Sequence, residues 1–344
     1  MGATAVAARA IGRMRSGGDG AEGPKSSVAT RAIDRLRGDA AARSYRLKHE
    51  EKAGRGLRRI ALGRAEHALE QLDEAESGDF ATSVHESRKD LKKLRAVLRL
   101  ARRRLGEDLY RAENRRYRDA GRLLSAGRDA EVKLETLDSL AERFGEEFPA
   151  EGVSGWREVL VLERKVTARV AKGDGIVAEA RSEIAAGREL ILALPLKGSS
   201  WGLVGPGLAR SYRRGRRAMR RLLDEPSREL VHEWRKRAKD LWYQLRILRG
   251  AWPAVLGEAA EEAHRLTELL GDHHDLTVLS EDAARRPGLL GRAEPGLQAL
   301  IARRQEELLE EAVALGRRLY AEKPDAFGAR FKAYWDAWRR ASGP

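Results

Sequence analysis

The sequence predicts an all-α protein, and three observations support this. From Ala41 onward, apolar residues recur with the period of an amphipathic helix almost throughout the chain. No stretch alternates apolar and polar residues in the way that is typical of a strand. The composition is 35% charged, 42% hydrophobic and only 6% aromatic, which fits a chain of long helices better than a sheet protein.

The helical period divides the chain into segments. Residues 1–40 are rich in Gly, Ala, Ser and Arg without any period, which predicts a disordered basic tail. The sequence Gly173-Asp174-Gly175 is a candidate break in the fifth predicted helix. We expect helices at residues 43–76, 79–105, 107–126, 129–144, 155–194, 203–223, 227–250, 254–271, 275–284, 295–321 and 325–340.

Two of these helices carry the same basic motif. The helix at 79–105 contains His85, Arg88, Lys89 and Lys92, and the helix at 227–250 contains His232, Arg235, Lys236 and Lys239. Spacings of three, four and seven place each set on one face, and Arg99 and Arg246 extend the two faces. Like charges on one stripe are unfavourable by roughly 0.2–0.5 kcal/mol per pair, so the stripes indicate a polyanionic ligand. Glu86 and Glu233 are expected to point away from them.

The opposite face of each motif helix is apolar, so these are core helices with one charged edge. The apolar faces consist of Val84, Leu91, Leu94 and Leu98 in the first helix, and of Val231, Trp234, Ala238, Leu241 and Leu245 in the second.

A second repeated element indicates an internal duplication. The segment from Leu123 to Asp129 aligns with the segment from Leu269 to Asp275, in the same order relative to the basic motif. Arg128 and His274 precede the aspartates, which we expect to cap the next helix. We predict a tail at 1–40, a first helical half at 41–195, a linker at 196–207 and a second half at 208–344.

The first helices of the two halves also align if a three-residue gap is allowed. Arg64 and His67 then match Arg214 and Arg217. The segment 212–221 around these arginines is strongly basic, and we expect part of it to face the same cavity as the His232 helix.

Charge and composition narrow the class of function. Lys and Arg number 67 against 53 Asp and Glu, a net charge of +14, and this bias favours an anionic partner. Cysteine is absent, which excludes disulfides and thiolate metal sites. No apolar stretch is long enough to span a bilayer and no signal peptide is recognisable, so we expect no membrane contact and a cytoplasmic protein.

The residues also argue against a metal site and against catalysis. His273 and His274 are adjacent, so on a helix they point about 100° apart and cannot easily ligate one ion. No carboxylate cluster for Mg²⁺, phosphate-binding glycine loop or activated nucleophile occurs at a usable spacing. We therefore expect neither an enzyme nor a cofactor.

With its doubled motif, the chain resembles the CHAD family over residues 41–340. The resemblance implies two helical bundles related by a pseudo-two-fold axis, with a basic channel between them that binds inorganic polyphosphate. It implies ligand roles for the eight motif residues and for Arg128 and His274. At the position of Arg95, the second half has Trp242 instead. The E-x-E-x-K strand of tunnel-type triphosphatases, which precedes many relatives, is not found, which favours a stand-alone binding module.

The leading hypothesis is non-enzymatic binding of polyphosphate, with targeting to polyphosphate granules as its purpose. In a shared channel, Lys89 and Lys236 should point into one concavity. The alternative is a helical protein that binds the backbone of RNA or DNA. Bases would stack on exposed aromatic rings, whereas Trp234, Trp242 and Tyr243 mostly fall on the apolar side of their helix.

Overall fold

The computed structural model describes residues 44–77, 79–125, 129–173 and 175–341, and every regular element in these ranges is a helix. The all-α prediction is therefore confirmed. The predicted tail at 1–40 lies outside the described residues. In the part of the chain that is described, no helix is long and apolar enough to cross a membrane.

Four helices from the first half of the chain form one bundle: α3 (Ala53–Ser77), α4 (Phe80–Leu100), α6 (Glu107–Leu123) and α9 (Ile176–Ala193). Asp79 is the N-cap of α4, and its carboxylate accepts hydrogen bonds from the amides of Ala81 and Thr82. A short helix, α5 (Arg102–Leu105), links α4 to α6. α6 and α9 approach closely because Gly187 has no side chain; a Cβ there would lie 2.4 Å from the Tyr117 hydroxyl.

Five helices of the second half form another bundle: α10 (Gly205–Asp224), α11 (Arg228–Leu248), α12 (Pro253–Ala284), α14 (Glu294–Leu319) and α15 (Pro324–Arg340). Trp234 of α11 is fully buried against α14, where Gly316 leaves room for the indole ring. The short elements are α13 (Pro287–Leu290) and the 3₁₀ helices at Gly145–Glu147, Trp201–Leu203, Arg249–Ala251 and Gly291–Ala293.

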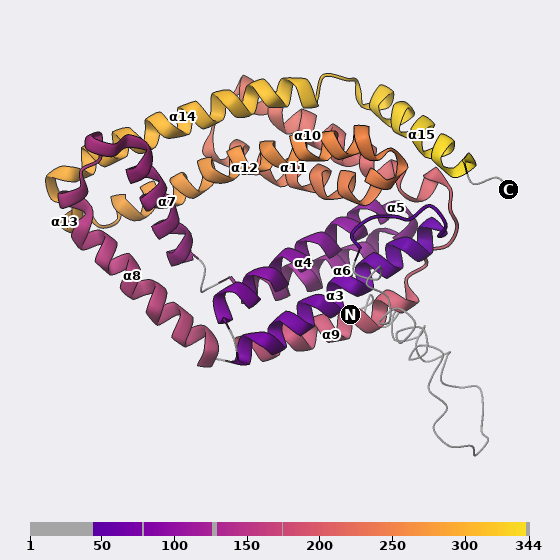
Figure 1. Ribbon diagram of the computed structural model, residues 1–344, viewed down its shortest axis with the longest axis horizontal. Coiled ribbons are helices and arrows are strands. Elements are labelled where there is room, and N and C mark those ends of the chain that lie inside the picture. Colours follow the sequence, from indigo (N-terminus) through magenta and orange to yellow (C-terminus); the bar gives the residue numbers. More distant parts are fainter. Residues whose placement is uncertain (1–43, 78, 126–128, 174, 342–344) are drawn as a thin grey trace, which may run out of the picture.

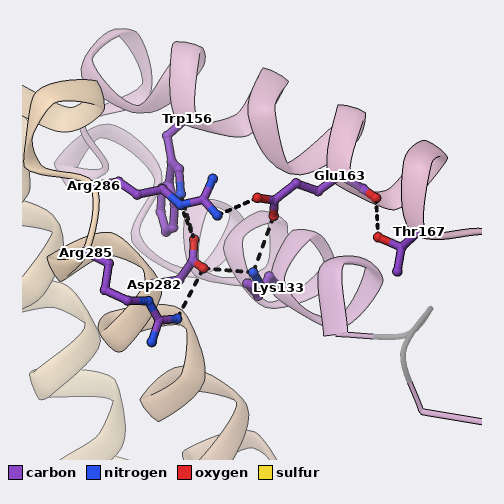
Figure 2. A network of polar contacts seen from close by, with 7 residues as sticks. All are labelled: Lys133, Trp156, Glu163, Thr167, Asp282, Arg285 and Arg286. Atoms are coloured by element: carbon purple, nitrogen blue, oxygen red, sulfur yellow. Dashed lines mark hydrogen bonds and ion pairs between the residues drawn. The ribbon is translucent and has the colours of Figure 1, made fainter. Parts of the chain in front are cut away.

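An arm formed by α7 (Asp129–Phe144) and α8 (Ala150–Gly173) joins the two bundles (Figure 1). α7 packs on α12 and α14, whereas α8 contacts α13 at one end and α9 at the other. At the α12 contact, the buried Asp282 carboxylate accepts hydrogen bonds from Lys133 Nζ at 2.8 Å and Trp156 Nε1 at 3.1 Å (Figure 2). The arm therefore ties the first half of the sequence to the second.

The predicted helix boundaries need three corrections. The first helix begins at Ala53, because the preceding residues form a strap in which the Leu47 amide donates to the Ile247 carbonyl at 2.9 Å. The fifth predicted helix begins at Ala150 rather than at 155, whereas its candidate break at Gly173-Asp174-Gly175 is confirmed: α8 ends at Gly173, and Gly175 before α9 adopts a left-handed φ of 68°. The helices predicted at 254–271 and 275–284 are one continuous helix, α12, so Asp275 lies inside it and caps nothing.

Candidate anion-binding site

A cavity of about 600 Å³ lies between α4 and α11, with α6 forming a third wall. Of the described side chains around it, nine are cationic and one is a carboxylate. The lining residues are Arg88, Leu91, Lys92, Arg95, Arg99, Tyr117, Arg118, Gly121, Arg122, Ser125, Lys236, Arg237, Lys239, Asp240 and Tyr243. Because the two basic stripes contribute to one cavity, a single anion could contact both motif helices.

The α4 wall is a continuous row of cations. Arg88, Lys92, Arg95 and Arg99 follow each other at spacings of three and four, so they lie on one helix face. Burial, together with the charge of Arg99, lowers the pKa of Arg95 to about 10. Its guanidinium donates from Nε to the Asn114 amide oxygen at 3.1 Å. The crowding of positive charge on this wall favours occupation by an anion.

The α11 wall is rotated relative to the prediction. Lys236 and Lys239 line the cavity as expected, but Arg237, Asp240 and Tyr243 join them. The cavity therefore meets a face of α11 about one residue further round than the predicted stripe. His232 and Arg235, the first members of that stripe, turn toward α12 instead.

His232 and His274 form a compact pair beside the cavity. Their ring centroids lie 4.4 Å apart. Burial, followed by the nearby charge of Lys236, lowers the pKa of His232. Burial, followed by the charges of Arg235 and His232, lowers the pKa of His274 to about 4. The charge of Lys239, which lines the cavity, also lowers the pKa of both imidazoles, so the histidine pair is coupled electrostatically to the site.

Arg235 is held by acidic groups of α12. Its Nη1 atom lies 3.7 Å from a carboxylate oxygen of Asp275. A Cβ on Gly271 would come within 3.2 Å of the same guanidinium, so the glycine leaves room for it. This contact explains why α12 keeps a glycine in its interior, despite a cost of about 1 kcal/mol relative to Ala.

Several predicted site residues lie outside the cavity. Lys89 forms an ion pair with Glu86 at 2.7 Å, so of the expected pair only Lys236 lines the concavity. Glu86 accordingly reaches the basic stripe, contrary to prediction. His85 is half-buried on α4 and is not part of the lining. Arg246 does not extend its stripe, because its guanidinium lies over the rings of Tyr45 and Trp242 at 5.5 and 5.3 Å.

The remaining predicted arginines contribute less directly. Arg214 of α10 lies 3.7 Å from Glu233, which therefore also faces basic side chains, contrary to prediction. Arg217 is exposed and lies outside the lining. Arg128 is outside the described residues.

Sequence reasoning missed the third wall. Arg118 and Arg122 of α6 line the cavity, and with Arg115 they follow the spacing of three and four that identified the motif helices. The same signal could have found them. Asp240 and Arg237 had no comparable signal.

The aromatic side chains of the cavity are largely covered. Tyr243 is 6% exposed and Tyr117 is 1% exposed, and burial raises the pKa of Tyr243 to about 12. Neither ring therefore offers a free face to a nucleobase. No group of three or more His, Asp or Glu suited to a metal ion occurs among the described residues.

Comparison with known proteins gives a consistent result. The family model described as the CHAD domain matches residues 59–284. The structure is similar to the crystal structure of the CHAD domain from the plant Ricinus communis, with a TM-score of 0.54 and 17% sequence identity over 86% of this chain and 96% of that chain. At this identity the likeness shows the fold alone. No curated protein matches the chain significantly.

Proposed function

Because the chain belongs to the CHAD domain family, we propose that it binds inorganic polyphosphate in the cavity between α4, α6 and α11. The observation that carries this proposal is the lining itself, in which nine cations from three helices face one carboxylate. Seven of these cations are half-buried, and Arg122 and Lys236 are exposed. Such an excess of partly desolvated positive charge is unfavourable without an anion.

The chemistry of polyphosphate suits this wall. The polymer carries about one negative charge per phosphate and presents no base edges, so cations at regular intervals are sufficient to bind it. Arginine can contact two phosphate oxygens at once, and lysine supplies a mobile point charge. Much of the affinity should come from release of condensed counterions, so binding should weaken strongly with salt.

Nucleic acid is the alternative ligand, and the rings of the site argue against it. Proteins that bind single strands without sequence preference stack bases on exposed aromatic side chains. Tyr117 and Tyr243 are covered at their place in the wall. The site is therefore better suited to a backbone of phosphates alone.

We propose a binding role without catalysis. Phosphoryl transfer usually needs carboxylates that hold Mg²⁺. Asp240, the one carboxylate among the described lining residues, is already engaged by Arg99 and Arg237 at 3.1 and 3.0 Å. Cytoplasmic recruitment to polyphosphate granules would be a use for such a module, and localisation of a fluorescent fusion in granule-forming cells tests it.

The test of the function is a competition assay at physiological salt. Long-chain polyphosphate should displace a labelled polyphosphate far better than single-stranded RNA or DNA does. The variant Arg88→Gln/Lys92→Gln/Lys239→Gln should bind at least about a hundredfold more weakly, since each contact contributes on the order of 1 kcal/mol or more. Equal displacement by RNA would instead favour the nucleic-acid alternative.

A matched control removes the same charge elsewhere. Arg103, Arg104 and Arg111 are exposed and lie outside the lining. The variant Arg103→Gln/Arg104→Gln/Arg111→Gln should keep most of the affinity. If both triple variants lose affinity equally, net charge rather than this cavity determines binding.

A further inference from the structure

Among the described residues that line the basic cavity, Asp240 is the only carboxylate, and it lies between cations of both bundles. Its Oδ1 atom is 3.1 Å from Nη1 of Arg99 on α4. Its Oδ2 atom accepts a hydrogen bond at 3.0 Å from Nη1 of Arg237 on α11. Asp240 is 8% exposed, so both contacts are shielded from water.

The Asp240 contacts continue as a chain of alternating charges. Arg237 donates from Nε to Glu233 at 2.7 Å, and Glu233 lies 3.7 Å from Arg214 of α10. Although burial acts in the opposite direction, the hydrogen bond to Glu233 and the charge of Asp240 raise the pKa of Arg237. Part of the positive wall is thus neutralised by the protein itself.

On α4 the ion pair at the corresponding positions has its acidic residue first and its basic residue second, and neither residue lines the cavity. When the two basic motifs are aligned on His85 and His232, Asp240 falls at the position of Lys93 and Arg237 at that of Asp90. Asp90 is fully buried and binds Lys93 at 2.8 Å and Arg64 of α3 at 3.0 Å. Only α11 therefore places the carboxylate of this pair in the wall of the cavity.

A carboxylate in the wall of the cavity repels a polyanion. The Asp90–Lys93 pair of α4 shows that an i,i+3 ion pair can be made on a motif helix without placing its carboxylate in the cavity. We propose that Asp240 is a fixed counterion of the site. It positions the guanidinium groups of Arg99 and Arg237 when the cavity is empty, and it lowers the affinity for the polyanion so that binding is readily reversible. This inference rests on the proposed binding of polyphosphate.

If Asp240 is a counterion, its removal should change the salt dependence of polyphosphate binding, which the removal of a purely structural residue would not do. Cations already neutralised by Asp240 hold few mobile counterions, so a bound polyanion releases few ions from them. Removing the carboxylate leaves Arg99 to attract ions from solution, whereas Arg237 keeps its contact with Glu233. Affinity and its dependence on salt should then rise together.

The experiment measures polyphosphate affinity at several salt concentrations for the parent and for Asp240→Asn. The variant should bind about tenfold more tightly at low salt. Its plot of log affinity against log salt should be steeper by about one unit. The matched control is Asp138→Asn, which removes an exposed carboxylate paired with Arg157 on the arm at 3.0 Å and should change neither quantity.

A second comparison leaves Asp240 in place and so applies even if Asp240→Asn does not fold. Lys236 is exposed in the lining, and Lys236→Gln should reduce the salt slope by about one unit. Arg99→Gln should reduce it by clearly less, because Asp240 already neutralises that cation.

Weaker binding by Asp240→Asn with an unchanged slope would show that the residue is structural and would overturn the inference. An equal loss of slope in Arg99→Gln and Lys236→Gln would also overturn it. Failure of the parent protein to bind polyphosphate is a different result, since it refutes the proposed function itself.

Discussion

The imidazole rings of His232 and His274 lie with their centroids 4.4 Å apart, one on α11 and the other on α12. The Nδ1 atom of His232 is buried without a hydrogen-bond partner among the described residues. Both pKa values are lowered, chiefly by burial and next by neighbouring cations. In the empty protein the pair is therefore neutral near pH 7, beside a wall of permanent positive charge.

Polyphosphate binding should take up protons at this pair. A bound polyanion favours the charged imidazole, so it raises the pKa of both histidines relative to the free protein. By linkage, affinity should be constant above the bound-state pKa, should rise as pH falls through it, and should level off below the free-state pKa. The measurement is the dissociation constant at several pH values and fixed ionic strength.

The double variant His232→Gln/His274→Gln should show a flatter dependence on pH than the parent. His85→Gln is the comparison, since His85 carries the same motif position but lies outside the cavity lining and apart from the pair. An identical pH profile for the double variant and the parent would mean that the pair is not sensitive to the ligand.

The empty protein should lose stability in acid through His274. Its folded-state pKa is about 4, below the value of about 6.5 expected for the unfolded chain. Between these two values the unfolded state binds more protons, so stability is retained above about pH 6.5 and is lost as pH falls toward about 4. Melting temperatures across this range should fall less for His274→Gln than for the parent, whereas equal slopes would contradict the pKa.

Two lysines of α4 provide a direct test of the cavity. Lys92 lines it, whereas Lys89 lies outside the lining and pairs with Glu86. Lys92→Gln should weaken polyphosphate binding about tenfold, and Lys89→Gln should weaken it by much less. Titration calorimetry on both variants measures the difference, and a larger effect at Lys89 would place the ligand on another face of α4.

The α6 wall of the cavity allows an independent test of the site. Arg118→Gln/Arg122→Gln should weaken binding, since both side chains line the cavity. The salt slope should fall by about one unit rather than two, because Asp119 lies 2.8 Å from Arg118 and 3.6 Å from Arg122 and neutralises part of their charge. Arg111 is exposed on the same helix and pairs with Glu107 at 2.6 Å. Arg111→Gln should leave binding near the parent value, and a null result for the double variant would limit the site to α4 and α11.

The sequence predicted the helical class and most of the cationic wall. Arg88, Lys92 and Arg99 line the cavity, as do Lys236 and Lys239. These residues could be found because helical spacing defines a face.

The rotation of α11 could not be predicted, because it depends on neighbours distant in sequence. Trp234 is buried on the predicted apolar face, but His232 contacts His274 and Arg235 contacts Asp275, so α12 covers the first members of the predicted stripe. Lys236 and Lys239 belong to both the predicted and the observed face, and the cavity meets Arg237 and Asp240 on the side of these lysines away from Arg235. The spacing of residues within one helix carries no information on its contacts with helices that are distant in sequence.

The continuity of α12 was missed for a similar reason. Gly271 followed by Asp272 has the local signature of a helix end. In the fold this glycine leaves room for the Arg235 guanidinium, and helix propensity gives way to that packing.

The arm provides the last prediction, which concerns stability rather than binding. Asp282 is 2% exposed and accepts hydrogen bonds from Lys133 and Trp156, while Arg285 and Arg286 lie within 3.4 Å (Figure 2). Burial alone would raise the pKa of Asp282, but the hydrogen bonds from Lys133 and Trp156 outweigh it and the pKa is lowered. This stabilisation is present above the unfolded-state pKa of about 3.9 and is lost as pH falls through the lower folded-state value.

Asp282→Asn should therefore destabilise the protein at neutral pH by about 3 kcal/mol, because it removes the closer anion of the buried Lys133 ammonium, at 2.8 Å, and leaves only Glu163 at 3.5 Å. Chemical denaturation measures the change. Asp138→Asn is the control on the same arm; its carboxylate pairs with Arg157 in an exposed position, and such pairs contribute roughly 0–1 kcal/mol. Since neither residue lines the cavity, affinity for polyphosphate in the folded variants should stay near that of the parent. A change as small for Asp282→Asn as for Asp138→Asn would show that this network does not hold the arm against the second bundle.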